Sequence, residues 1–149
     1  MLPLKAEAQS LYDTDYTQWL ETTVAKLRHR DYATVDWESL IEEIEDMGRS
    51  ERRRLERNLI VVLLHLLKWQ HQPQKRCGSW AGSLVEHRRR MRRAIEDSPS
   101  LKPYFAAIVV ASYKQAVKQA MAETGLSLEP FSVECPYSLA EVLDDEWLP

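Results

Sequence analysis

The stretch LERNLIVVLLHLLKWQHQP, residues 55–73, is the most apolar part of this chain of 149 residues. Only His65 interrupts its apolar middle, so a helix formed here is apolar on almost every side. That pattern is typical of a helix that its neighbours cover from several directions. Pro73 ends the helix, because a proline offers no N–H to the helical hydrogen bonds. The sequence therefore predicts a central buried helix over about residues 50–71.

Other segments have apolar residues three and four positions apart, which is the spacing of a helix that packs by one face. These segments span residues 14–29, 36–48 and 79–96, and a further one starts within 98–103 and runs towards Gly125. A capping box from Ser138 to Glu141 predicts one more short helix in the tail. We therefore expect an all-α fold, an antiparallel helical bundle of about five helices with a short C-terminal helical tail, in a single domain over residues 1–149.

Composition indicates a globular protein in a reducing compartment. Apolar residues make up 44% of the chain and charged residues 29%, which is ordinary for a soluble domain. The first residues, MLPLKAEAQSLYD, lack the basic start and apolar core of a secretory signal. No apolar run approaches the roughly 20 residues that span a bilayer. We expect a cytoplasmic protein that does not bind membranes, with Cys77 and Cys135 as free thiols.

Charge is segregated along the chain. The net charge is −7 over residues 1–48, +10 over 49–93 and −6 over 94–149. One interpretation is that clustered arginines bind an anionic partner such as nucleic acid. The candidates for anion binding are Arg52, Arg53, Arg57, Arg89, Arg92 and Arg93. The favoured interpretation is that the acidic helices and tail lie against the basic helices and pair with them along solvated edges.

A polar line runs along the apolar central helix. Glu51, Asn58 and His65 recur at seven-residue intervals, and His87 lies within the apolar stripe of its own helix. If those faces meet, two imidazoles and a carboxylate could bind a metal or act as an acid and base. The candidate buried polar cluster is Glu43, Glu51, Asn58, His65 and His87. Structural histidines are the favoured interpretation, because HExxH and other ligand motifs are absent, and we expect no metal and no cofactor.

Several motifs in this order carry a resemblance to a known family. They are YDTDYTQWL (12–20), LIEEIEDMGRSE (40–51), LLHLLKWQHQP (63–73), SW (79–80), SPSL (98–101) and CPY (135–137). Over residues 10–149 the chain resembles domain-of-unknown-function family 29, a bacterial family prominent in cyanobacteria. The resemblance implies a small helical protein and brings no established activity, cofactor or partner. The positions matching the family's motifs are Glu42, Glu43, Glu45, Gly48, His65, Leu66, Leu67, Trp69, Trp80 and Pro136.

Three functions are compatible with these features. The first is a non-enzymatic interaction module that binds a macromolecular partner, in the simplest case another protein. The second is a metal-dependent or acid/base enzyme with a site around His65. The third is a nucleic-acid binder that uses the arginine-rich residues 49–93. The sequence leaves the oligomeric state open.

Overall fold

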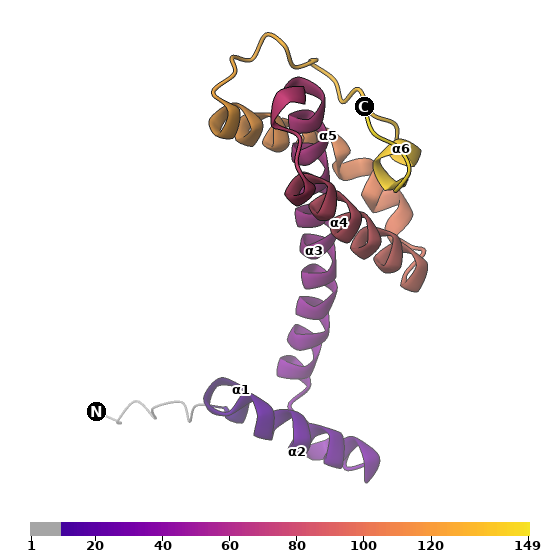
Figure 1. Ribbon diagram of the computed structural model, residues 1–149. Helices are drawn as coiled ribbons and strands as arrows, with labels where there is room; N and C mark the ends of the chain where they lie inside the picture. Colours follow the sequence, from indigo (N-terminus) through magenta and orange to yellow (C-terminus); the bar gives the residue numbers. More distant parts are fainter. Residues whose placement is uncertain (1–9) are drawn as a thin grey trace, which may run out of the picture. The chain divides into compact units, whose positions relative to one another are not determined.

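The computed structural model describes residues 10–149, and these contain six α-helices, two short 3-10 helices and no strand (Figure 1). The α-helices are α1 (Leu11–Thr14), α2 (Tyr16–Arg28), α3 (Trp37–His71), α4 (Gly78–Asp97), α5 (Leu101–Thr124) and α6 (Leu139–Leu143). The predicted all-α fold with a short C-terminal helix is confirmed. Across the described residues, no helix has the combination of length and hydropathy that crossing a bilayer requires.

The chain separates into two compact units at a point within the first half of α3. We call the described residues up to Gly48 the N-terminal unit and Arg49–Pro149 the C-terminal unit. The 3-10 helices η1 (Tyr32–Thr34) and η2 (Pro73–Lys75) lie in the first and second unit, respectively. The single domain expected from the sequence stays a prediction, because two compact units can still unfold as one.

The predicted helix break at Gly48 is wrong, since α3 continues through this residue without interruption. A glycine ends a helix when its backbone turns left-handed, as Gly125 does after α5 with φ 74°. Gly48 instead keeps a helical backbone between Met47 and Arg49, two residues that favour helix strongly. A Cβ added at Gly48 would meet nothing within 4 Å.

A tyrosine–glutamate contact organises the N-terminal unit. Trp19 of α2 is only 4% exposed, and the ring of Tyr12 meets its ring edge-on at 4.7 Å. Glu43 of α3 accepts hydrogen bonds from the hydroxyls of Tyr12, at 3.0 Å, and of Tyr16. The hydrogen bond to Glu43 raises the pKa of Tyr12 to about 12, because it favours the protonated phenol. These bonds join α1 and α2 to the first part of α3.

Helix caps in this unit partly match the sequence. Asp36 accepts from the backbone N–H of Ser39 at 3.2 Å and caps α3, as its position predicts. Asp15 caps α2 by accepting from the N–H of Gln18 at 3.0 Å, so this helix begins two residues later than the segment 14–29 predicts. The short α1 precedes that cap and was not expected from the sequence.

The second part of α3 is the centre of the C-terminal unit, as its apolar sequence predicts. Leu59, Val62, Leu63 and Leu66 are completely inaccessible to solvent. The side chains that bury them and share their core include Leu84, Met91, Phe105, Tyr113, Ala116, Ala120 and Val142. Pro73 follows the end of α3 at His71, and the polypeptide then turns through η2 into α4. Apolar burial on this scale is the main source of stability for a domain of this size.

Arg88 of α4 fastens the C-terminal tail to this core. Its guanidinium donates to the carbonyl oxygens of Val142 at 2.9 Å, Trp147 at 3.0 Å and Glu141 at 3.1 Å. One turn further along, Arg92 donates to the carbonyl of Leu143 at 2.9 Å. Carbonyls at the end of a helix such as α6 have no partner within the helix, so the guanidinium supplies the donors that they lack.

The expected pairing of the basic helices along solvated edges does not hold for Arg88, because the residue is only 1% exposed. The spacing does contain the correct signal. Arg88 lies four residues after Leu84 and three before Met91, so it belongs to the apolar stripe of α4. The predicted capping box of α6 is confirmed, with Glu141 N–H bound to Ser138 and the Glu141 carboxylate bound to Ser138 N–H, each at 3.1 Å.

Replacing Arg88 with alanine is expected to lower the free energy of unfolding by roughly 2–4 kcal/mol, because three carbonyls lose their donor and a buried volume empties. Urea denaturation would measure this loss. The matched control is Arg90→Ala on the same helix, an exposed residue whose removal should change stability by less than about 1 kcal/mol. Equal stability of the two variants would contradict the anchoring role of Arg88.

Replacing Gly48 with alanine is expected to stabilise the protein by roughly 0.5–1 kcal/mol, because alanine loses less backbone entropy in a helix and has room for its methyl group. Urea denaturation and the circular dichroism at 222 nm measure the effect. A destabilised variant would contradict a continuous α3 at this point.

Candidate functional site

Polar side chains from α3 and α4 meet along one side of the C-terminal unit, which we call the α3–α4 seam. It contains a cavity near the end of α4, two imidazoles further along, and a contact in which Lys68 lies over the ring of Trp80 at 4.6 Å. The apolar side chains of the second part of α3 pack into the core. The seam is therefore where polar groups of α3 can lie partly buried without being enclosed.

The cavity has a volume of about 380 Å³ and a wall from each helix. It is lined by Glu51, Arg54, Leu55 and Asn58 of α3 and by Arg89, Arg90, Arg93, Ala94 and Asp97 of α4. Asn58 is only 7% exposed. Its amide makes no hydrogen bond with any residue in the described range 10–149. The amide atoms are not among the side-chain atoms that are both buried and unpartnered, so they remain accessible from the cavity that Asn58 lines.

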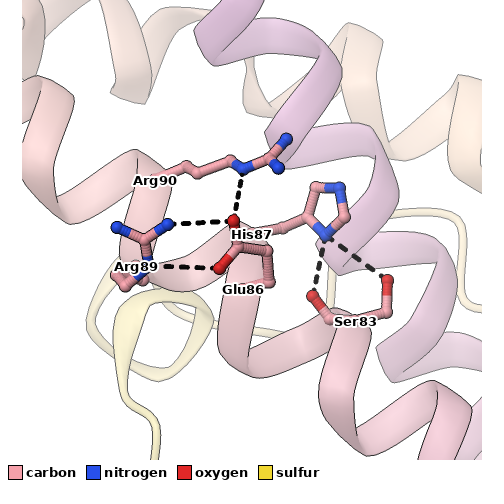
Figure 2. Close-up of polar contacts among 5 residues, drawn as sticks. All are labelled: Ser83, Glu86, His87, Arg89 and Arg90. Carbon is pink, nitrogen blue, oxygen red and sulfur yellow. Dashed lines mark hydrogen bonds and ion pairs between the residues drawn. The ribbon is translucent and has the colours of Figure 1, made fainter.

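The arginines of the cavity are held by carboxylates of their own helices. Glu86 accepts from Arg89 Nε at 3.1 Å and Nη2 at 2.9 Å, and from Arg90 Nε at 2.8 Å (Figure 2). The hydrogen bonds from Arg89 and then Arg90 lower the pKa of Glu86 to about 2. Arg54 pairs with Glu51 at 3.0 Å, and Arg93 lies 3.9 Å from Asp97. All these pairs are exposed, so each contributes little to stability.

The two imidazoles of the seam have the same protonation pattern. His65 Nδ1 lies 2.8 Å from the carbonyl oxygen of Val61, and His87 Nδ1 lies 2.8 Å from that of Ser83. Figure 2 shows this contact of His87, together with a second one of 3.3 Å to the Ser83 hydroxyl. A carbonyl oxygen accepts and does not donate, so Nδ1 carries the proton in both neutral rings. Nε2 is then the basic nitrogen of each ring.

Burial lowers the pKa of His65, and the nearby side chains of Lys68 and His87 lower it further. The hydrogen bond to Val61 and the charge of Glu123 act in the opposite direction and are outweighed. His65 is therefore held neutral at pH values where an exposed histidine would begin to take up a proton.

The structure brings together only part of the sequence-predicted polar cluster. Glu51 and Asn58 line the cavity, and His87 lies near enough to His65 to lower the pKa of His65. Glu43 is engaged by two tyrosines in the N-terminal unit. Among residues 10–149, no group of three or more His, Cys, Asp or Glu side chains is arranged to hold a metal ion.

The arginines that the sequence singled out have different surroundings. Arg92 binds Asp145 at 2.6 Å in the tail, and Arg52 lies over the ring of Tyr104 at 5.2 Å. Arg89 and Arg93 line the cavity. The side chains of Arg53 and Arg57 are exposed. Sequence reasoning missed the two other arginines of the cavity, Arg54 and Arg90, although Arg54 lies four residues before Asn58 and so on the same side of α3.

The comparisons with known proteins give one result. A family model described as Domain of unknown function DUF29 matches residues 11–148. The chain belongs to the DUF29 family. The resemblance seen in the sequence is thereby confirmed, and the match extends over most of both units of this DUF29 protein. No curated protein and no solved structure matches the chain.

The stability of this DUF29 protein is expected to fall between pH 7.5 and pH 5.5, and the variant His65→Gln should show a smaller fall. Because the folded pKa of His65 is lowered, the unfolded chain binds its proton first as the pH drops below about 6.5. The stabilisation is thus complete at higher pH and is lost on acidification. The measurement is the melting temperature of each protein across this pH range, expressed as the difference from the melting temperature of that protein at pH 8. Parallel profiles of the two proteins would contradict it.

Proposed function

We propose that this DUF29 protein is a non-enzymatic interaction module that binds a partner protein through the N-terminal unit. The proposal retains the cytoplasmic location expected from the sequence. The observation that carries it is a set of large apolar side chains exposed on α2 and on the first part of α3. They are Tyr16, Leu20, Val24, Trp37, Ile41, Ile44 and Met47. Contiguous exposed apolar side chains are typical of sites that bind another molecule.

These residues form stripes at helical spacing. Tyr16, Leu20 and Val24 recur every four residues, so they lie on one side of α2. Leu20 and Val24 also line a shallow depression of about 390 Å³. Ile44 and Met47 of α3 are 60% and 61% exposed, which is unusual for side chains of their size. A single helix of a partner with apolar residues at the same spacing could cover such a stripe.

Charge indicates the chemistry of that partner. The described part of the N-terminal unit, residues 10–48, contains ten Asp and Glu residues and three Lys and Arg residues. A second copy of the unit would carry the same negative charge, so pairing the two would oppose like charges. The partner that fits is therefore an amphipathic helix of another protein with Lys and Arg residues beside its apolar face.

Two designed amphipathic peptides test this proposal. Both carry the same leucine face, and one is flanked by lysines and the other by glutamates. The lysine-flanked peptide is expected to bind the full-length protein and to bind more weakly as salt increases, whereas the glutamate-flanked peptide should not bind. Fluorescence anisotropy of labelled peptide measures both. Binding of neither peptide, or equal binding of both, would contradict the proposal.

Matched variants locate the binding surface. Ile44→Ser is expected to weaken binding of the lysine-flanked peptide about tenfold, because an apolar anchor is lost. Val110→Ser removes a similar side chain that is 66% exposed on α5 of the C-terminal unit, and it should leave affinity within about twofold. An equal loss in both variants would contradict the assigned surface. A dimer in light scattering that Ile44→Ser dissociates would make a second copy the occupant instead.

A further inference from the structure

We propose that the cavity of the α3–α4 seam binds the phosphate group of a small molecule. This site lies in the C-terminal unit and is independent of the partner-binding surface proposed for the N-terminal unit. Donors of hydrogen bonds face the cavity from both helices, and the arginines among them carry positive charge. Phosphate oxygens are acceptors only, and guanidinium groups match their geometry with paired donors.

Asn58 is the first argument for a ligand. The residue is more than nine-tenths buried and lines the cavity, and its amide lacks a hydrogen-bond partner among the described residues while staying accessible from the cavity. A leucine at this position of α3 would continue the apolar core without leaving a polar group unpaired. An asparagine there fits a site in which the amide N–H₂ donates to a bound group.

Unused arginine donors are the second argument. Arg90 binds Glu86 through Nε, and its two terminal nitrogens make no hydrogen bond with residues 10–149 (Figure 2). Arg93 reaches Asp97 only at 3.9 Å, which is too long for a hydrogen bond. Exposed arginine–carboxylate pairs are weak, so turning these guanidinium groups towards a phosphate costs little.

The balance of charge also favours an anion. Arg54, Arg89, Arg90 and Arg93 face three carboxylates, those of Glu51, Glu86 and Asp97, because Arg89 and Arg90 share Glu86. One positive charge is left, and the shared carboxylate cannot saturate both guanidinium groups. A volume of about 380 Å³ is at the lower end of small-molecule sites and exceeds what a bare phosphate ion fills.

A small phosphate ester fits this arrangement better than a nucleic acid does. The donors converge on one cavity from two walls and do not form a stripe along one helix. Leu55 and Ala94 supply its apolar lining, and no aromatic side chain is present there to stack on a base.

Calorimetric titration of the full chain with inorganic phosphate, glycerol 3-phosphate and a short DNA duplex tests the proposal. Saturable binding of phosphate or glycerol 3-phosphate supports it, and whichever binds more tightly identifies a free ion or an organic phosphate as the source. Binding of neither overturns the proposal. The duplex could instead bind tightly, with an affinity that falls steeply as salt increases, while neither small probe shows saturable binding. That result would overturn the phosphate-site proposal in favour of a surface that binds nucleic acid.

Single-residue variants test whether the phosphate probe binds in the cavity. Asn58→Leu and Arg90→Ala are each expected to weaken binding of the better small probe about tenfold, because each loses a bond to a charged group. Arg53→Ala removes the same charge from an exposed position of α3 outside the lining and should change affinity less than about threefold.

Stability separates loss of the site from loss of the fold. Asn58→Leu should be about as stable as the parent protein without phosphate, since the amide that it removes makes no hydrogen bond within the described residues and leucine has a similar size. Phosphate should raise the melting temperature of the parent and of Arg53→Ala, and it should not raise that of Asn58→Leu. An equal rise in all three proteins would overturn the proposal, because it would reflect a general effect of the anion.

Discussion

Leu59, Val62, Leu63 and Leu66 of α3 have no contact with solvent, because side chains of α4, α5 and α6 cover them. This burial determines where the polar groups of the C-terminal unit can lie. Polar residues that interrupt an apolar helix must reach its edge or find a partner. Asn58 and His65 do so at the α3–α4 seam, where one lines a cavity and the other bonds to its own helix. The candidate site is thus a by-product of how the core packs, placed at the side of α3 where α4 leaves space.

The arginine-rich sequence of α4 serves several purposes at once. Arg88 points into the core and Arg92 to the tail, whereas Arg89 and Arg90 share a carboxylate beside the cavity. Neighbouring residues on a helix point about 100° apart, so a run of like residues is distributed over different surroundings. Net charge along the sequence therefore describes this segment poorly. A prediction from charge alone treats these arginines as one surface. In the folded protein they contribute to three different places, which are the buried anchor of the tail, a contact with the tail and the wall of the cavity.

Local signals in the sequence predicted most of the fold. The capping box of α6 and the stop at Pro73 were correct because their causes lie within a few residues. Gly48 misled the prediction, since a glycine permits a helix end without requiring one. The surroundings of Arg88 depend on carbonyls more than fifty residues away, and helical spacing alone could only suggest that it is buried. Predicting that arginines of the two helices line one cavity requires knowing that α3 packs against α4. The helical periodicity of a sequence does not specify which helices pack together.

Arg88 recognises the tail through three backbone carbonyls, so the contact depends on the course of the main chain more than on the identity of the residues that supply it. An exchange of a side chain between Glu141 and Trp147 leaves those oxygens in place. An insertion or deletion in the same segment moves at least one of them out of reach. The Arg88 contact therefore depends on the length of this segment, whereas a change of side chain that leaves the backbone in place keeps its three acceptors.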